Sequence, residues 1–250
     1  MVQLKSPREI DAMFAGGQIL YATHEAVRAA VRPGVSTLDL DRVAEEFIRS
    51  HPGATPSFKG LYGFPGSICA SINEEIVHGI PSAKRVLKDG DIISVDIGVF
   101  HGGLHTDSAR TWPVGTVDAE SERLLRVTAE SLEAGIAQCV VGNHIGDIGH
   151  AIEAVVIKGR LAVVRELVGH GVGFQMHEEP QVPNHGKPKR GMKLVPGLTL
   201  AIEPMVNLGT AATRTLSDKW TVVTADGQRS AHFEHTVAIT DAGPRVLTRP

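Results

Sequence analysis

The sequence DIISVDIGVFHGGLHTDSARTWPV spans residues Asp91 to Val114 and contains two runs rich in apolar and β-branched residues. The turn His101-Gly102-Gly103 separates the two runs. β-Branched residues in alternation are typical of strands, and paired glycines suit the backbone of a tight hairpin turn. We therefore predict a β-hairpin with the strands Asp91–Phe100 and Leu104–Val114.

Four acidic residues stand in apolar, strand-like sequence rather than on polar helix faces. Asp96 and Asp107 lie on the two strands of the predicted hairpin, where they can face each other. Glu203 and Glu234 occupy the similar settings AIEPM and HFEHT. One such acid could simply be exposed on an edge strand, but this explanation is poor for all four. Buried carboxylates are costly unless they are paired or metal-bound, so the four together predict a shared cation.

A histidine with glycine neighbours completes the predicted cluster. His170 lies in Gly169-His170-Gly171-Val172-Gly173, where the absent side chains would leave room for a bulky ligand. A lone histidine is more often satisfied by backbone groups, but the four acids favour a ligand role. Four carboxylates and one imidazole suit two divalent first-row ions bridged by carboxylates.

The composition excludes several classes of protein. With 250 residues, 42% of them hydrophobic, the chain can bury a sizeable core and is not disordered. A net charge of −3 and only 4% aromatic residues give no general basis for nucleic-acid binding. No apolar stretch predicts a membrane span, and the N-terminus MVQLKSPREIDAMF does not resemble a secretory signal. We therefore expect a cytoplasmic protein with free thiols at Cys69 and Cys139.

The two halves of the chain share an order of elements. Helices are predicted at Ser6–Val31 and Thr37–Ser50, and again at about Asp118–Val141 and from beyond Gly142 to about Glu166. Strand-like sequence follows each pair of helices.

Two matching patterns support an internal duplication. Gly34–Asp39 matches Gly142–Asp147 at an offset of 108 residues, and Leu87–Asp96 matches Leu194–Glu203 at an offset of 107. We therefore predict one domain, residues 1–250, built from pseudo-equivalent halves of about 1–115 and 116–250. This repeat places Asp96 and Glu203 at corresponding positions.

The combined motifs resemble those of type I methionine aminopeptidases over nearly the whole chain. They are CASINEEIVHGIP from Cys69, Asp96 and Asp107 at their spacing, GHGVG from Gly169, MHEEP from Met176, IEPM from Ile202 and FEHT from Phe233. The resemblance implies the α+β "pita-bread" fold, with two pseudo-symmetric halves and a central antiparallel sheet covered by helices.

The resemblance also implies roles for individual residues. The five metal ligands match Asp96, Asp107, His170, Glu203 and Glu234. His78 and His177 match two histidines that contact the substrate, and Glu203 is the expected proton shuttle. A pocket for the methionine side chain would be walled by Cys69, Phe64, Met176 and Trp220. Compared with familiar members of the family, Phe64 stands where tyrosine is common and Met176 where phenylalanine is usual. Phe58 and Leu61 replace more polar or smaller residues. All four residues are apolar.

The activity implied is removal of the initiator methionine from nascent polypeptides when the second residue is small. Two divalent ions, Co, Mn, Fe or Zn, would serve as cofactors of a monomeric enzyme. The basic run Lys187–Arg190 is best explained as solvated surface, with transient contact to the ribosome as a weaker hypothesis. Two alternatives stay open: a proline-directed aminopeptidase of the same fold, and a catalytically inactive binding module.

Overall fold

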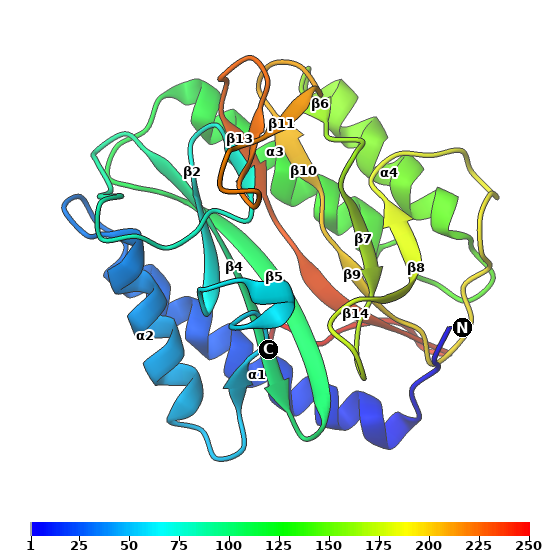
Figure 1. Cartoon of the computed structure of the whole chain (residues 1–250). Coiled ribbons are helices and arrows are strands. Elements are labelled where there is room, and N and C mark those ends of the chain that lie inside the picture. The colour runs from blue at the N-terminus through cyan, green and yellow to red at the C-terminus, as the bar shows by residue number, and fades with distance from the viewer. Residues whose placement is uncertain (1) are drawn as a thin grey trace.

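The computed structural model describes residues 2–250, and within them four α-helices form two pairs (Figure 1). The helices are α1 (Pro7–Ala30), α2 (Thr37–Arg49), α3 (Ala119–Ile136) and α4 (Ile145–Lys158). At the start of α1 the Ser6 hydroxyl accepts from the Glu9 amide while the Glu9 carboxylate accepts from the Ser6 amide. This reciprocal cap fixes the predicted start of the helix.

The second pair of helices is shorter than the sequence predicts. α3 ends at Ile136 instead of near Val141, because the chain turns so that the Gly142 amide bonds to the Leu194 carbonyl at 3.1 Å. α4 ends at Lys158 instead of near Glu166, because Arg160 adopts a left-handed conformation with φ 57°. These two predicted helix ends were wrong.

The strands form antiparallel pairs that are divided among four hydrogen-bonded sheets within residues 2–250. In the first half, β4 (Ile92–His101) lies between β1 (Thr55–Pro56) and β2 (Ile68–Ile72) and also pairs with β5 (Leu104–Pro113). A five-stranded sheet has the order β15 (Gly243–Val246), β14 (His235–Thr240), β9 (Thr199–Ile202), β7 (Val168–Gly171) and β8 (Glu178–Pro183). The two three-stranded sheets are β13 (Ser230–His232), β10 (Met205–Asn207) and β6 (Ala162–Val163), and β11 (Thr213–Thr215), β12 (Val222–Thr224) and β3 (Glu75–Val77).

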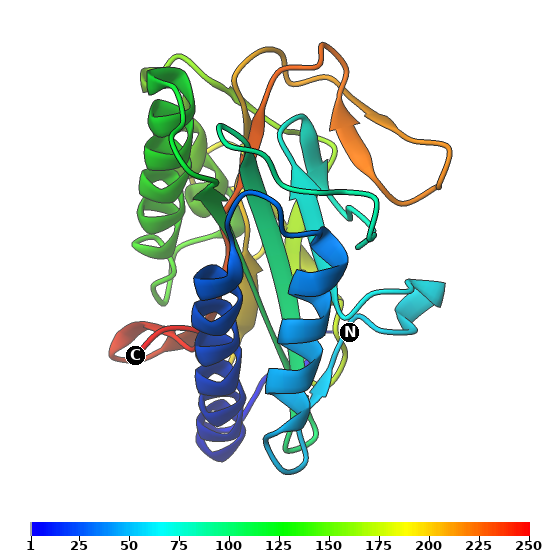
Figure 2. The ribbon, with the colours of Figure 1, turned by 90° about the vertical axis from the view of Figure 1, so that its left-hand side faces the viewer.

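Three of the four α-helices of residues 2–250 lie on one side of the strands, and loops extend on the opposite side. Figure 2 shows α1, α3 and α4 to the left of the strands, whereas the short helical turn η1 (Leu61–Gly63) and the β11–β12 hairpin extend to the right. Each helix pair has its own core: Leu20, Leu40 and Ile48 are buried with the first sheet, and Leu124, Ile148 and Ile152 with the second. The proposed duplication of residues 1–115 and 116–250 stays a prediction.

The predicted hairpin is confirmed and it positions two acids. β4 and β5 pair so that Asp96 lies opposite Ala109 and Gly98 lies opposite Asp107. Positions two residues apart along a strand share one face, so Asp96 and Asp107 project from the same face as diagonal neighbours.

The other two acids lie between strands and not within them, which corrects the sequence interpretation. Glu203 follows β9 and precedes β10, and Glu234 follows β13 and precedes β14. β9 pairs with β14 in one sheet, whereas β10 pairs with β13 in another. The chain therefore leaves one sheet for another at both glutamates, and this break leaves their side chains free to turn into the interior.

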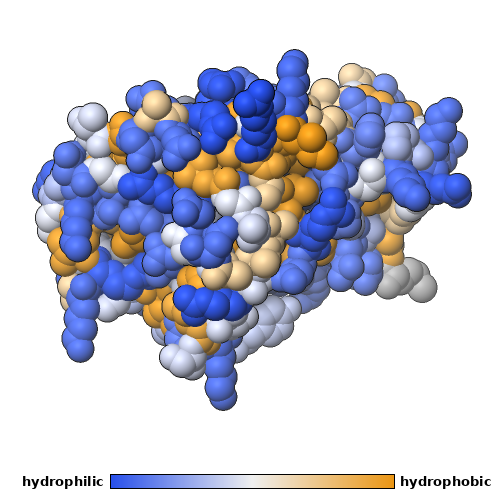
Figure 3. All heavy atoms as spheres, turned by 90° about the horizontal axis from the view of Figure 1, so that it is seen from above, coloured by the Kyte–Doolittle hydropathy of each residue, from blue (hydrophilic) through white to orange (hydrophobic). Residues whose placement is uncertain are grey.

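The outer surface is mostly polar. Figure 3 shows charged and polar residues over much of the face seen from above, with apolar residues gathered near its middle. Among the helices of residues 2–250, none combines the length and apolar character that a membrane crossing requires.

Two adjacent glycines in α1 provide a matched test of this packing. A Cβ at Gly17 would lie 2.0 Å from the backbone oxygen of Leu247, whereas a Cβ at Gly16 would meet no atom closer than 3.4 Å. Gly17→Ala should lower the free energy of unfolding by about 1–3 kcal/mol, the usual cost of overpacking. Gly16→Ala should leave it unchanged or raise it by up to about 1 kcal/mol, because alanine favours helix. Urea unfolding of both variants checks this, and equal stabilities would contradict the close approach of the C-terminal segment to α1.

Candidate metal centre

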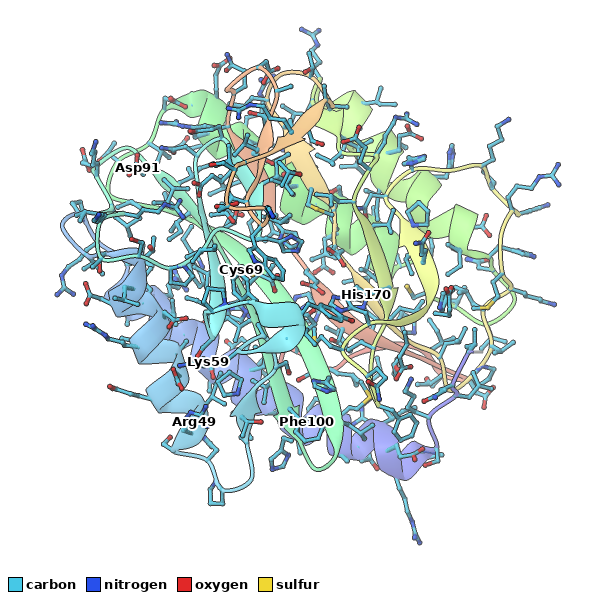
Figure 4. The ribbon with its side chains drawn as sticks, viewed as in Figure 1. Arg49, Lys59, Cys69, Asp91, Phe100 and His170 are labelled. Atoms are coloured by element: carbon cyan, nitrogen blue, oxygen red, sulfur yellow. The ribbon has the colours of Figure 1, made fainter. Side chains whose placement is uncertain are left out.

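The five sequence-predicted metal ligands line one cavity of about 190 Å³ between the two halves. They come from five different places in the chain: Asp96 on β4, Asp107 on β5, His170 on β7, and Glu203 and Glu234 at the two strand breaks. Figure 4 shows Cys69 on β2 and His170 on β7, two cavity residues from opposite halves.

Hydrogen bonds between the halves hold the acids in place. The Asp107 amide donates to the Thr236 hydroxyl at 2.9 Å, and that hydroxyl donates to the Asp107 carbonyl at 2.8 Å. The Glu234 amide donates to the Ala109 carbonyl at 2.8 Å. β5 of the first half is thereby fixed beside β14 of the second, so Asp107 and Glu234 meet although they are far apart in sequence.

The distances within the cluster suit a shared cation. One possible ligand atom from each of Asp107, His170 and Glu234 lies within 4.8 Å of the other two. His170 Nε2 lies 3.5 Å from Glu203 Oε1 and 3.7 Å from Asp107 Oδ2. An ion at this point could be reached by several side chains at once.

A backbone contact fixes the orientation of the His170 ring. Its Nδ1 is 2.8 Å from the Gly171 carbonyl, which accepts a hydrogen bond from a protonated Nδ1. The lone pair of Nε2 then faces the carboxylates, the arrangement typical of a metal-binding histidine.

The neighbouring glycines serve a different purpose from the one predicted. A Cβ on Gly169 would lie 2.3 Å from the Ala201 carbonyl oxygen, and one on Gly171 would lie 2.4 Å from that of Glu179. Their missing side chains therefore admit neighbouring strands and not a bulky ligand.

Burial makes the charged forms of these acids unfavourable in the metal-free chain. It raises the pKa of Asp96 to about 7 and that of Glu203 to about 8. Burial, and then the neighbouring carboxylates, raise the pKa values of Asp107 and Glu234 well above their ordinary range. Burial likewise lowers the pKa of His170 to about 4, which keeps its imidazole neutral and able to bind a metal.

Unpartnered polar atoms show that the residues present fit a metal. Within residues 2–250, Asp96 Oδ1, Asp107 Oδ1 and Glu234 Oε1 are buried without a hydrogen-bond partner. Buried carboxylate oxygens are normally satisfied, and hard or borderline divalent cations accept such oxygens together with an imidazole. The donor set and its orphaned atoms both fit a divalent ion.

An apolar wall adjoins the acids. Phe64, Cys69 and Trp220 line the cavity as predicted, and the Phe64 and Trp220 rings meet edge to face at 5.1 Å between centroids. Met176 is buried in the same apolar cluster, but it lies outside the cavity lining of the described residues. Val77 and Met205, which the sequence interpretation did not identify, contribute to the wall.

Both predicted substrate histidines line the cavity. His78 adopts a left-handed conformation with φ 60°, a strained state that is common at functional sites. His177 is exposed, and its ring lies 4.5 Å from that of His170 and 5.8 Å from that of Tyr62 between centroids.

Sequence reasoning missed His232, a fully enclosed histidine of the same cavity. Its Nε2 lies 3.6 Å from Glu203 Oε2 and has no hydrogen-bond partner in the described part of the chain. The signal available was its position two residues before Glu234, which places both side chains toward one side of an extended segment.

Comparisons with known proteins agree over the whole chain. Residues 11–241 match Metallopeptidase family M24. Methionine aminopeptidase 1 from Bacillus subtilis is 53% identical over 249 residues, which cover 100% of both chains. A solved methionine aminopeptidase from Thermotoga maritima also covers 100% of both chains, with a TM-score of 0.97 at 42% identity. A solved Xaa-Pro dipeptidase from Bacillus anthracis has a TM-score of 0.78 at 21% identity. The match covers 99% of this chain and 62% of that chain, and at this identity it shows only that the two proteins share a fold.

Two buried aspartates allow a matched test of metal binding. If Asp107 binds the metal as predicted, Asp107→Asn should lower bound metal and reduce kcat by at least about a hundredfold, because it replaces an anionic oxygen of the cluster with a neutral amide. Asp41→Asn alters a buried acid of α2 that accepts from the Ser67 and Ile68 amides, so it should lower stability and leave metal content unchanged. Elemental analysis after dialysis measures both, and full metal content in Asp107→Asn would contradict the assignment.

The raised pKa values predict an unusual dependence of stability on pH for protein stripped of metal. Between about pH 4 and pH 8 the folded chain binds more protons at Asp96 and Glu203 than the unfolded chain does. The contribution of each of these two acids to the free energy of unfolding should therefore fall as pH rises, by about 1 kcal/mol per pH unit up to its raised pKa, whereas the lowered pKa values of buried histidines such as His78 and His170 contribute in the opposite sense below about pH 6.5.

Thermal unfolding of the wild type and of Asp96→Asn in a chelator from pH 5 to pH 7 isolates the contribution of Asp96, because the histidines are common to both proteins. The wild-type Tm should fall relative to that of Asp96→Asn as pH rises, and saturating Mn²⁺ should raise the wild-type Tm most at pH 8. A wild-type Tm that rises with pH relative to Asp96→Asn in the chelator would contradict the burial of Asp96.

Proposed function

Since this chain belongs to Metallopeptidase family M24, we propose that it is a methionine aminopeptidase, which cleaves the peptide bond after an N-terminal methionine. The observation that carries the proposal is the 53% identity across the full length of both chains with the Bacillus subtilis enzyme. The convergence of five ligand-type side chains beside an apolar pocket supports it. The family and the carboxylate cluster also indicate use of a divalent metal.

We propose that the site holds two ions, bound by Asp96, Asp107, His170, Glu203 and Glu234. When bound, divalent ions supply Lewis acidity to the scissile carbonyl and lower the pKa of the attacking water. Iron, manganese, cobalt and zinc all accept such a ligand set, and the finer assignment of bridging roles to Asp107 and Glu234 belongs to this proposal.

The chain's own residues supply the proton transfers. The Glu203 carboxylate lies at the cavity, where its Oε1 is 3.5 Å from His170 Nε2, so it could take a proton from water and return it to the leaving amine. The Asn184 side-chain amide donates to the Glu203 carbonyl at 3.0 Å and thereby fixes the backbone of this residue. Glu203 is the proton shuttle in this proposal.

Two histidines would act on the substrate's amide. His177 projects into the open side of the cavity and would donate to the developing oxyanion. His78, whose ring lies edge-on to Trp220 at 6.5 Å between centroids, would bond near the scissile nitrogen. Both interactions gain strength as charge develops in the transition state, so they would raise kcat more than they lower KM.

The apolar wall provides the recognition of methionine. Phe64, Cys69 and Trp220 would contact the side chain, with Met176 supporting them from behind. In this proposal the second substrate residue lies beside the metal cluster, where a large side chain would clash. The proposed substrates are therefore N-termini of new polypeptides that begin Met-Gly, Met-Ala or Met-Ser. Contact of Lys187–Arg190 with the ribosome and a monomeric, cytoplasmic enzyme remain predictions of the sequence.

A peptide series tests the proposed function directly. Met-Ala-Ser should be cleaved, Met-Lys-Ser and Met-Phe-Ser should have kcat/KM values lower by at least about a hundredfold, and Ala-Pro-Ala should resist cleavage. Leu-Ala-Ser should be poorer than Met-Ala-Ser by only about 10–200-fold, because apolar pockets discriminate weakly per methylene. Preferred cleavage of Ala-Pro-Ala would instead support the proline-directed alternative, and no cleavage with any metal would support the inactive binding module.

A further inference from the structure

A lysine near the N-terminus is buried beside the loop Gly173–Glu178, which carries His177. Lys5 precedes α1, and its side chain is 1% exposed. Its ammonium donates to Glu178, whose side chain is 6% exposed, and to the Gln3 carbonyl at 3.0 Å. Lysine is almost never so deeply buried without a partner, because removing its charge from water is costly. Glu178 is therefore the partner that makes the burial of the Lys5 ammonium possible.

The loop from Gly173 to Glu178 is shaped around this lysine. A Cβ on Gly173 would lie 2.2 Å from Lys5 Cε, so only glycine leaves space for the lysine stem. Gly173 also has a φ of 153°, which disfavours other residues. The Lys5 amide donates to the Gly197 carbonyl at 2.7 Å, which anchors the lysine backbone on the second half.

Glu178 connects Lys5 to the backbone of the loop. One carboxylate oxygen accepts from Lys5, and the other accepts from the Gln175 amide at 2.9 Å. The Gly173 amide donates to the Gln175 carbonyl at 3.0 Å, and the Gly173 carbonyl accepts from the His105 amide at 2.7 Å. The loop is thus closed on itself and tied to the hairpin of the first half.

This loop presents Met176 and His177 to the cavity region. Met176 is 3% exposed within the apolar cluster, whereas His177, directly before Glu178, projects beside His170. His177 is exposed, so its position depends on the backbone of the loop more than on close packing of its ring.

We propose that Lys5 and Glu178 are positioning residues: their buried ion pair holds the loop so that His177 points at the scissile carbonyl. The inference rests on the proposed function of His177. Loss of the pair should leave the metal ligands in place, because His170, the one nearest to the loop, is also held by the pairing of β7 with Ala201 of β9. It should reduce kcat through misplacement of His177.

Four variants separate positioning from simple stability. Lys5→Met and Glu178→Gln each leave one buried partner without its ion pair, so both should lower Tm and reduce kcat on Met-Ala-Ser about tenfold. The double variant Lys5→Met/Glu178→Met removes both charges and should regain Tm, because apolar replacement of a whole buried pair is tolerated. Its kcat should stay low, since the bond to the Gln175 amide is still missing. Glu179→Gln, at the exposed neighbour, is the matched control and should match the wild type.

The measurements are kcat and KM well below Tm, bound metal, and amide exchange of the peptide 173–178. We expect a kcat loss with KM changed less than about twofold, full metal content, and faster exchange in the three pair variants but not in Glu179→Gln. His177→Ala gives the upper limit of the kcat loss, about a hundredfold. Recovery of kcat together with Tm in the double variant, or unchanged exchange, would overturn the proposal. Failure of the wild type to cleave any Met-X-Ser peptide would overturn the proposed function instead, and amide exchange would still test the anchorage of the loop.

Discussion

Buried carboxylates of like charge face one another where the two halves meet, and the rest of the structure is organised around them. Two such charges about 4 Å apart repel by about 4 kcal/mol at an effective dielectric constant of 20. Burial and mutual repulsion accordingly raise the pKa values of Asp107 and Glu234. A divalent cation between the carboxylates replaces this repulsion by attraction, so the geometry that raises these pKa values also favours the binding of a divalent metal.

The fold supplies rigid backbone positions for groups that would otherwise move apart. Asp107 and Glu234 are held by backbone hydrogen bonds between β5, β14 and their neighbours. Each helix pair has its own core, and a further apolar cluster that includes Ile10, Leu104 and Val172 joins the two halves. Chemistry at the cluster can therefore depend on precise placement without requiring that the acids themselves stabilise the fold.

The sequence predicts those features that depend on local chemistry. The alternation in Asp91–Val114 predicts a hairpin, and the capping sequence at Ser6 predicts the start of α1; both are present. The sequence identifies the four acids and His170 as one group, because buried charges in apolar sequence need a common partner. The family resemblance, which the comparisons confirm, adds the pita-bread fold and the activity.

Features that depend on contacts between distant segments could not be predicted in this way. The strand breaks at Glu203 and Glu234 arise because adjacent segments pair in different sheets. The glycines beside His170 look suited to a ligand in the sequence, but they in fact admit neighbouring backbone. Likewise, Lys5 and Glu178 are 173 residues apart, and neither has a local signal for burial.

The proposed site has these acids and His170 holding two cations, one nearer Asp96 and one nearer His170. Anomalous diffraction from crystals grown with Mn²⁺, collected on both sides of the manganese absorption edge, measures this most directly. We expect two anomalous peaks within the carboxylate cluster, with His170 bonded to only one of them. A cluster without any peak, or with its peaks bound to residues outside these five, would contradict it.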